Sequence, residues 1–275
     1  MSAATNELPR PQALALSLPS AGVLEIRLNR PESRNALSLA MVGELRAALA
    51  WAEGQPGMRA VVLRGNGGHF CSGGDLKDMA MARMRLADEG PAVLEKLNAA
   101  FGELCVAFDH TPLATVAVLE GTVMGGGFGL ACVADIALAG RSVSFRLPET
   151  SLGVVPAQIA PFLVQRLGYS QARRLAVSGG RLDGEQALRL GLVHELHEDA
   201  ALDAALAAAL AQVRQCAPQA VGATKALMAR ALHEPARGLV ADAAQVFAKA
   251  ALGEEGMEGI AAFVEKRAPR WAAAQ

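Results

Sequence analysis

Aromatic side chains and excess charge are both scarce in this sequence. Aromatic residues make up 4% of the 275 residues, apolar residues make up 52%, and the formal net charge is -1. The core is therefore expected to be aliphatic and packed with alanine. A chain without a strong electrostatic field is not drawn to nucleic acid or to an anionic membrane, so neither is expected as a partner. The length suffices for one large domain, or for a domain with an appendage.

Several targeting and linking signals are also missing. No apolar run approaches the length of a membrane span. The opening residues MSAATNELPRPQ lack the basic-then-apolar pattern of a signal peptide. The four cysteines are scattered and fit neither a zinc spacing nor a disulfide framework: Cys71, Cys105, Cys132 and Cys216. We therefore expect a cytoplasmic protein whose thiols mostly pack in the core.

Strand and helix patterns alternate along the first two thirds of the chain. Apolar runs and turn residues predict strands at 13–18, 22–28, 59–65, 113–120 and 135–140. Helical spacing predicts helices from Ser38 to about Trp51, over 92–109, and from a start within 125–134. Ser38 is a suitable N-cap for the first of these helices. The alternation indicates an α/β fold with a largely parallel sheet.

The character of the sequence changes near residue 198. Residues 199–275 are rich in alanine and follow helical patterns, without any further strand signal. We therefore divide the chain into a core over 1–198 and a helical region over 199–275. The second region is interpreted as a lid or an assembly region.

Two glycine-rich loops follow predicted buried strands: GNGGHFCSGGD at 65–75 and MGGGFGL at 124–130. Neither fits the dinucleotide pattern G-x-G-x-x-G, because the last position falls on Leu130 when counting from Gly125, and the other starting points fail as well. Glycine alone permits tight packing or a positive φ. Glycine also lets a backbone N–H approach a ligand, and a helix start leaves such groups unpaired. Two such backbone N–H groups that point at the same ligand atom would form an oxyanion hole.

Four motifs occur in a characteristic order: LNRPESRNALS (28–38), GGHFCSGGDLKDM (67–79), GTVMGGGFGLACVADIALA (121–139) and LPETSLGVVP (147–156). Together they resemble the crotonase family of enoyl-CoA hydratases and isomerases. The resemblance covers almost the whole chain, since RLDGEQALRLGLVHEL (181–196) and EGIAAFVEKRAP (258–269) also match. It implies an α/β fold, a crotonase-like spiral of repeated ββα units in two stacked sheets, with a C-terminal helical assembly region. It also implies a homotrimer or a dimer of trimers.

The resemblance assigns roles to residues of the two loops. Gly74 and Gly126 match the family's two oxyanion-hole donors, whose backbone N–H groups hold the thioester carbonyl of an acyl-CoA. Each such donor is typically worth roughly 10²–10³ in rate. The residues expected to surround the acyl thioester in these loops are Ser72, Gly73, Asp75, Leu76, Lys77 and Gly125. Contacts with the CoA portion are expected from Arg30, Arg34, Ala36, Phe263 and Lys266, the last from a neighbouring subunit.

Only one of the family's two catalytic acids is present. Two-acid hydratases carry a glutamate two positions after the glycine triplet, where this chain has Gly129, while Glu149 matches the second acid. One carboxylate can take a proton from water and return a proton to Cα, or it can move a proton between two carbons. Hydratase and isomerase activities are therefore both open. The empty position at Gly129 suggests space for an acyl chain that brings its own carboxylate.

The segment LGVVPAQIAPFLVQRLG (152–168) is similar to the corresponding segment of hydratases of glutaconyl-type thioesters. These enzymes act on 3-methylglutaconyl-CoA in leucine breakdown and on isohexenylglutaconyl-CoA in acyclic terpene breakdown, and SGGDLKDM favours the second. A distal carboxylate would suit a cation. The candidate cations are Lys77, Arg83, Arg85 and Arg146.

Other chemistries find less support in the sequence. His194 and His197 have no partner cluster, so a metal site is not expected. Cys71 has no base nearby in sequence, and Ser72 lies in no G-x-S-x-G elbow. The expected activity is hydration without a cofactor, since CoA is part of the substrate. A double-bond isomerase and an acyl-CoA binder that has lost catalysis are the alternatives, and retention of Glu149 speaks against the binder.

Overall fold

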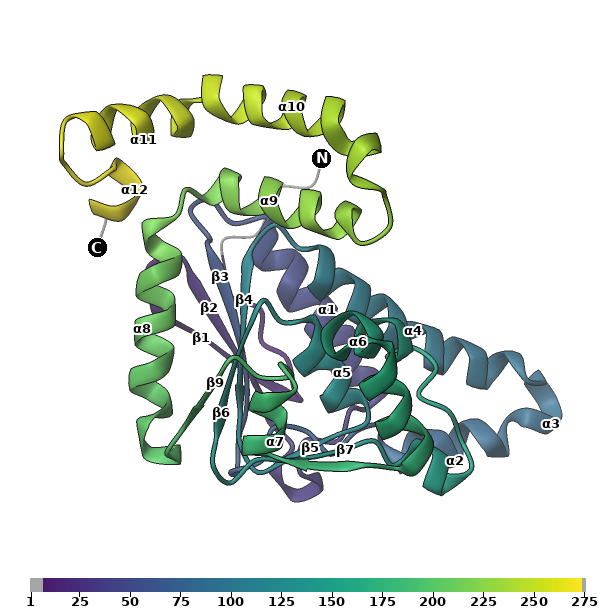
Figure 1. Cartoon of the computed structure of the whole chain (residues 1–275). Coiled ribbons are helices and arrows are strands. Elements are labelled where there is room, and N and C mark those ends of the chain that lie inside the picture. Colours follow the sequence, from purple (N-terminus) through teal and green to yellow (C-terminus); the bar gives the residue numbers. More distant parts are fainter. Residues whose placement is uncertain (1–6, 274–275) are drawn as a thin grey trace.

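A computed structural model describes residues 7–273 of the chain, and it is built around two β-sheets (Figure 1). The first sheet has six strands in the order β1-β2-β3-β4-β6-β9. Only the β1–β2 pair is antiparallel. The strands are Leu14–Ser20, Val23–Leu28, Ala60–Gly65, Ala114–Leu119, Ile136–Gly140 and Glu195–His197. Every residue of β3 and β4 is buried, as expected for parallel strands covered on both faces.

The second sheet is small and consists of three-residue strands. These are β5 (Thr122–Met124), β7 (Ser144–Arg146) and β8 (Arg181–Asp183), in that order. Two single parallel bridges extend it, from Cys71 to Val123 and from Leu37 to Gly74. Both glycine-rich loops therefore belong to this second layer.

Successive turns of the chain repeat one arrangement. A strand of the first sheet leads to a strand or bridge of the second layer, and a helix then returns the chain. The helices of the four turns are α1 (Leu39–Glu53), α4 (Ala92–His110), α5 (Gly126–Val133) and α6 (Ala160–Ser178). The predicted α/β spiral of ββα units is confirmed, although the repeat has no counterpart in residue identity.

The predicted strands and helices of the first 140 residues are all present. Ser38 caps α1 as predicted, because its hydroxyl accepts a hydrogen bond from the N–H of Met41 at 3.2 Å. The sequence pattern did not indicate α2 (Leu76–Met84) and α3 (Leu86–Glu89). These two helices and the start of α4 project from one side of the body (Figure 1).

The main core lies between α1, α4, α5 and the inner face of the first sheet. A second apolar cluster covers the outer face of that sheet, where α8 (Leu202–Gln215) packs through Leu202, Leu206 and Leu210. Helix α8 thus belongs by packing to the sheet, although it lies beyond the predicted boundary at 198. Residue 198 separates the last strand, β9, from the helices that follow.

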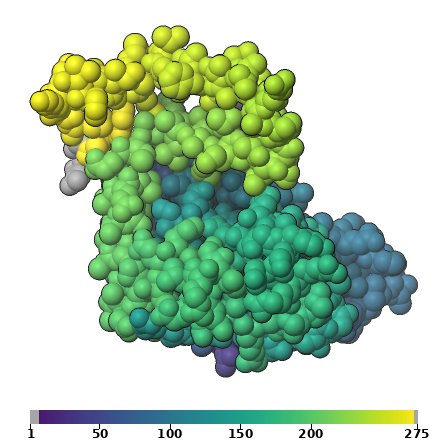
Figure 2. All heavy atoms as spheres, in the orientation of Figure 1, coloured from purple at the N-terminus to yellow at the C-terminus, as the bar shows by residue number. Residues whose placement is uncertain are grey.

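The remaining helices form an arm on one side of the body (Figure 2). They are α9 (Pro218–Ala231), α10 (Ala236–Leu252), α11 (Glu254–Val264) and α12 (Arg270–Ala273), while α7 (Gly184–Arg189) lies between β8 and β9. Lys225 of α9 ties the arm to the body, because its ammonium pairs with Asp135 at 2.6 Å and donates to the Leu113 carbonyl at 2.8 Å. Over residues 7–273, every helix is too short or too polar to cross a bilayer.

Candidate active site

An open, mostly apolar cavity of about 540 Å³ lies where the two glycine-rich loops meet. Gly74, Gly126 and Glu149, the three predicted catalytic residues, all line it. Its other walls come from α2, α4 and the loop that precedes α6. The remaining lining residues are Leu37, Leu39, Val42, Asp75, Asp78, Met79, Arg83, Leu94, Leu97, Asn98, Phe101, Gly153, Val154, Val155, Pro156, Ala157, Gln158 and Ile159.

The bridge between Leu37 and Gly74 sets the direction of the Gly74 backbone. The Leu37 N–H donates to the Gly73 carbonyl at 2.8 Å, and the Asp75 N–H donates to the Leu37 carbonyl at 3.0 Å. In such a parallel pair the residue between these two bonds turns its own N–H and C=O to the opposite side. The N–H of Gly74 has no acceptor within residues 7–273.

Gly126 is the first residue of α5, so its N–H has no acceptor within the helix. The preceding Gly125 has φ +50° and ψ -116°, a conformation that side chains strongly disfavour. A Cβ on Gly127 would lie 2.7 Å from the Cβ of Cys71 and 2.8 Å from its carbonyl oxygen. The triplet is thus explained by backbone conformation at Gly125, by the free donor at Gly126 and by close packing at Gly127.

The two loops are in contact at Gly73 and Gly125, the residues that precede the predicted donors Gly74 and Gly126. A Cβ on Gly125 would lie 3.7 Å from the Cα of Gly73. Hydrogen bonds from the Cys71 N–H to the Thr122 carbonyl and from the Met124 N–H to the Cys71 carbonyl, both 2.9 Å, hold the loops in register. Because the preceding residues are in contact, Gly74 and Gly126 start from neighbouring positions, and both line the same cavity.

Glu149 places a carboxyl group beside these glycines. One carboxyl oxygen, Oε1, lies 3.0 Å from the position that a Cβ on Gly125 would take. The other, Oε2, is buried and has no hydrogen-bond partner. No cation of the described chain pairs with it, and burial raises the pKa of the carboxyl above its ordinary value. A carboxyl with a raised pKa and one buried oxygen free of hydrogen bonds is suited to taking and returning a proton.

The expected empty space beside Gly129 is absent. Gly129 is buried, and a Cβ there would lie 2.3 Å from Cγ2 of Ile159 and 3.7 Å from Cζ of Phe101. Gly129 is not part of the cavity wall. The interpretation that this glycine leaves room for the substrate is therefore wrong: Ile159 fills the volume into which a side chain at 129 would project.

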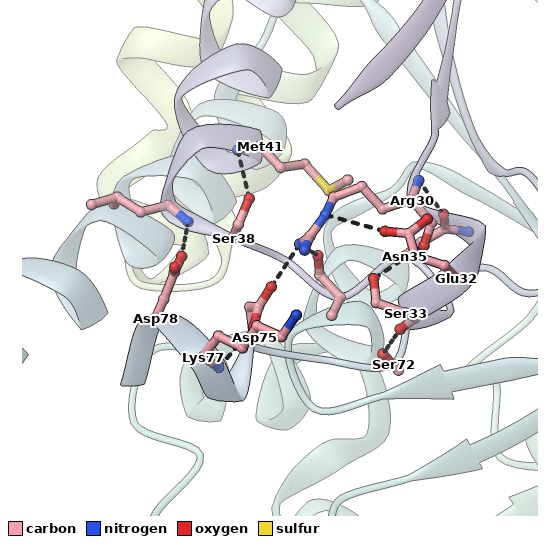
Figure 3. Close-up of polar contacts among 12 residues, drawn as sticks. Arg30, Glu32, Ser33, Asn35, Ser38, Met41, Ser72, Asp75, Lys77 and Asp78 are labelled. Atoms are coloured by element: carbon pink, nitrogen blue, oxygen red, sulfur yellow. Dashed lines mark hydrogen bonds and ion pairs between the residues drawn. The ribbon is translucent and has the colours of Figure 1, made fainter. Parts of the chain in front are cut away.

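An ion pair joins the first motif to the first glycine-rich loop (Figure 3). Nη1 of Arg30 donates to Asp75 Oδ2 at 2.7 Å and to the Ala36 carbonyl at 2.8 Å. Asp75 is buried and caps α2, accepting from the Lys77 N–H at 2.8 Å. Burial acts to raise its pKa, but the hydrogen bonds from Arg30 and the Lys77 N–H, together with the charges of Arg30 and Lys77, outweigh burial and lower it. The pair fixes the residue that follows Gly74.

Replacing Arg30 with methionine should therefore lower both kcat and the stability of the fold. The substitution keeps the length of the side chain but leaves the Asp75 carboxylate buried without its cation, which typically costs about 3–5 kcal/mol when the pair is fully buried. Because Arg30 is partly exposed, we expect a smaller loss of stability and a fall of tenfold or more in kcat. Steady-state kinetics and thermal melting measure both quantities. An unchanged kcat would show that the pair does not hold the Gly74 donor in place.

The first-motif residues predicted to contact CoA lie close to this loop. The Ser72 N–H donates to the Arg34 carbonyl at 2.9 Å, and the Arg34 side chain is exposed. The Ala36 carbonyl and the Arg30 guanidinium bind each other, so both already have internal partners. Contacts of these residues with CoA stay predictions.

Phe263 and Lys266 lie in the C-terminal arm, outside the cavity wall. Phe263 is 86% exposed, and Lys266 follows α11 with φ +55°. Neither residue lines the cavity of its own chain. Their predicted contacts with CoA therefore depend on assembly, as was expected for Lys266.

The four candidate cations have different surroundings. Arg83 of α2 is exposed but lines the cavity, and it has no carboxylate partner within residues 7–273. Arg85 pairs with Glu89 at 2.6 Å, and Lys77 is exposed beside Asp75. Arg146 lies outside the cavity wall, where its Nη2 donates to Ser151 at 3.4 Å. The structure thus singles out Arg83 as the cation of the cavity.

Leu76 is exposed at the start of α2 and is not part of the wall, although the wall continues on Met79 and Arg83 of the same helix. Much of the wall was missed at the sequence level. Residues 94, 97, 98 and 101 of α4 face the cavity at helical spacing. That stripe was visible in the predicted helix, whereas nothing local in the sequence relates it to the glycine-rich loops.

Neither a cysteine nucleophile nor a histidine metal site is supported by the geometry of the described residues. Burial raises the pKa of Cys71 to about 12, so it is a packed thiol and not a nucleophile. His194 Nδ1 accepts from the Ala137 N–H at 2.9 Å, and His197 lies in β9, not on a helix. Within residues 7–273, no cluster of three or more histidine, cysteine or acidic side chains is arranged to hold a metal ion.

Comparison with known proteins shows the family of the chain. The family model described as Enoyl-CoA hydratase/isomerase matches residues 19–274. The chain belongs to the enoyl-CoA hydratase/isomerase family. It is a hydratase-type enzyme of CoA thioesters.

Three relatives illustrate the range of this enoyl-CoA hydratase/isomerase family. The solved structure of Pseudomonas aeruginosa AtuE has a TM-score of 0.91 and 55% identity, covering 95% of this chain and 100% of that one. Mevalonyl-coenzyme A hydratase sidH of Aspergillus fumigatus is 31% identical, covering 97% of each chain. The 2,3-dehydroadipyl-CoA hydratase of Escherichia coli is 32% identical, covering 90% of this chain and 94% of that relative.

Proposed function

We propose that the enzyme adds water to the enoyl double bond of a glutaconyl-type CoA thioester, with Glu149 as its only acid–base group. The observation that carries this proposal is the buried carboxyl oxygen of Glu149, which has no partner and lies beside two loops with unpaired N–H groups. The other two carboxylates of the cavity wall are engaged. Asp75 binds Arg30, and Asp78 accepts from the Leu39 N–H at 2.6 Å.

In the proposed reaction, the thioester carbonyl accepts hydrogen bonds from the N–H groups of Gly74 and Gly126. Ionised Glu149 takes a proton from water, and the resulting hydroxide adds to Cβ. The electron pair of the double bond moves to the carbonyl oxygen as an enolate, which the two donors stabilise. Glu149 then returns its proton to Cα. The sum is addition of one water molecule without a net change of oxidation state, and Glu149 and the two N–H groups take part in every step.

A substrate with its own carboxylate is supported by the single cation that residues 7–273 contribute to the cavity wall. Arg83 lines a mostly apolar cavity without a carboxylate partner, and an acyl carboxylate would supply one. The Escherichia coli relative is named for an acyl group that ends in a carboxylate, since adipic acid is a dicarboxylic acid. The cavity has a long apolar wall formed by Leu94, Leu97, Met79 and Val155. Such a wall favours the long isohexenyl group of isohexenylglutaconyl-CoA over the methyl group of 3-methylglutaconyl-CoA.

The double-bond isomerase is the second candidate, and Ile159 is the observation that favours it. With an isoleucine filling the place of the second acid, no carboxylate opposite Glu149 holds the attacking water. Isomerisation needs only one group that moves a proton between two carbons. The two reactions differ in the absorbance of the enoyl thioester, which hydration removes and isomerisation into conjugation creates.

We expect turnover to rank isohexenylglutaconyl-CoA above 3-methylglutaconyl-CoA and both above crotonyl-CoA. The test compares kcat/KM for the three thioesters by loss of the enoyl absorbance, with product identified by mass. A gain of 18 Da confirms hydration, whereas a product of unchanged mass indicates isomerisation. Binding without any absorbance change at high enzyme concentration would identify a non-catalytic binder. A preference for crotonyl-CoA would contradict the glutaconyl-type substrate.

We also propose that the chain assembles as a trimer or a dimer of trimers. Large apolar side chains are exposed along the arm at Met228, Val240, Phe247, Leu252, Met257, Ile260, Phe263 and Val264. Contiguous apolar faces of this kind usually mark protein interfaces. Sedimentation at micromolar concentration is expected to show three or six chains, and a stable monomer would contradict assembly through the arm.

Three buried free thiols suit a reducing compartment, which supports a cytoplasmic location.

A further inference from the structure

Two amide side chains interrupt the apolar wall of the cavity. Asn98 lies on α4 and Gln158 lies in the loop before α6, and both line the cavity. Nε2 of Gln158 donates to Oδ1 of Asn98 at 2.8 Å. These are the uncharged polar side chains of a wall that is otherwise apolar, charged or glycine.

A glycine within α4 fixes Gln158 in this position. A Cβ on Gly102 would lie 2.1 Å from Oε1 of Gln158 and 2.7 Å from its Cδ, so the amide rests directly on the helix backbone. Glycine inside a helix costs about 1 kcal/mol relative to alanine. The helix thus accepts a less stable residue where the Gln158 amide must fit.

The pair has more donors than its own hydrogen bond uses. Two primary amides carry four N–H groups and two carbonyl oxygens. Their mutual bond consumes one of each and leaves three N–H groups and one oxygen, whichever way the amides are turned. No other side-chain or backbone partner of either amide occurs within residues 7–273. A surplus of donors at a cavity wall suits a ligand group rich in acceptor oxygens.

The distance of the amide pair from the predicted oxyanion hole matches the distance of C5 of the acyl chain from the thioester carbon C1. Cζ of Phe101 lies 3.1 Å from the position of a Cβ on Gly126, so α4 passes the predicted oxyanion hole at Phe101. Asn98 lies three residues earlier on the same face, about 4.5 Å along the axis. From a thioester C1 held at the hole, four bonds of about 1.5 Å in a zigzag place C5 about 5 Å away. In a glutaconyl group C5 is the carboxylate carbon.

We propose that Asn98 and Gln158 form a subsite that binds the C5 carboxylate of the acyl group, with Arg83 completing its charge. The proposal rests on the proposed function, because it assigns a place to the carboxylate of that substrate. The amides select the position of the oxygens, while Arg83 supplies a charge opposite to that of the carboxylate. Crotonyl-CoA ends at C4 and cannot reach the pair with an oxygen.

The test uses the full-length enzyme with Asn98→Leu and Gln158→Met, which keep the approximate shapes of the side chains. Lys96→Met, at an exposed position of α4 outside the cavity wall, is the matched control. We expect kcat/KM for 3-methylglutaconyl-CoA to fall about tenfold to hundredfold, the range for a lost hydrogen bond to a charged group. Turnover of crotonyl-CoA should stay within about threefold of the wild type in the same variants. Equal losses on both substrates would overturn the proposal and reduce the pair to a tether of the 153–159 loop.

A binding measurement separates this subsite from the proposed reaction. Glutaryl-CoA carries a C5 carboxylate without a double bond, and butyryl-CoA ends at C4. By titration calorimetry, the wild type should bind glutaryl-CoA more tightly, and both amide variants should lose that preference. If 3-methylglutaconyl-CoA is not turned over but the preference exists and is lost in the variants, the proposed function fails while the subsite stands. A wild type without the preference would overturn the subsite.

Discussion

Glu149→Gln should lower kcat by at least about 10²–10⁴, the usual effect of losing a general acid–base residue, while acyl-CoA binding survives. The reason is the absence of a substitute. Asp75 is paired with Arg30, Asp78 is bonded to the Leu39 backbone, and position 129 holds glycine. Steady-state kinetics and calorimetric binding of a saturated acyl-CoA measure the two effects. Activity within a few-fold of wild type would remove Glu149 from the mechanism, and Glu95→Gln on the exposed side of α4 is the control.

The same variant has a predictable effect on stability. Burial raises the pKa of Glu149 above its ordinary value of 4.5, so ionising this carboxyl is harder in the folded protein than in the unfolded chain. The wild type therefore loses stability as pH rises from the ordinary pKa through the raised one. Glu149→Gln should melt higher than wild type at neutral pH, and the difference should vanish below pH 4. The acid limb of kcat/KM for the wild type should also lie above pH 4.5.

Gly129→Glu should destabilise the protein and lower activity on every substrate. A Cβ at this position would lie 2.3 Å from Cγ2 of Ile159. Overpacking of a core typically costs about 1–3 kcal/mol, and a buried carboxylate without a partner adds to that cost. Thermal melting and kcat/KM for crotonyl-CoA and 3-methylglutaconyl-CoA measure the outcome.

Two further variants make the Gly129 result interpretable. Gly43 of α1 is exposed and a Cβ there meets nothing within 4 Å, so Gly43→Glu should gain up to about 1 kcal/mol from helix propensity alone. Combining Gly129→Glu with Ile159→Ala should recover folding and favour crotonyl-CoA over the glutaconyl-type thioester. The expectation would be contradicted by a stable Gly129→Glu single variant whose kcat/KM rises equally for both substrates. That result would show that Ile159 moves aside at little cost and that a second acid improves catalysis.

Local patterns predicted much of the scaffold. Runs such as AVVLRG and ATVAVL are continuous apolar segments of strand length, and they form the fully buried strands β3 and β4. Helical spacing after Ser38 and over 92–109 predicted α1 and α4 because amphipathic faces repeat within a few residues. By contrast, the second sheet consists of three-residue strands and single bridges. Segments that short carry no periodicity, so only their pairing with distant segments defines them.

The sequence by itself determined the chemistry available to this enzyme: two glycine-rich loops, one candidate acid at Glu149 and glycine at 129. Only the tertiary structure decided how these are used. The bridge to Leu37 turns the Gly74 N–H outward, Arg30 is committed to Asp75, and Ile159 closes the space beside Gly129. The physical reason is that hydrogen-bond direction and free volume depend on contacts between residues 30 to 45 positions apart, whose separation in space no local pattern specifies.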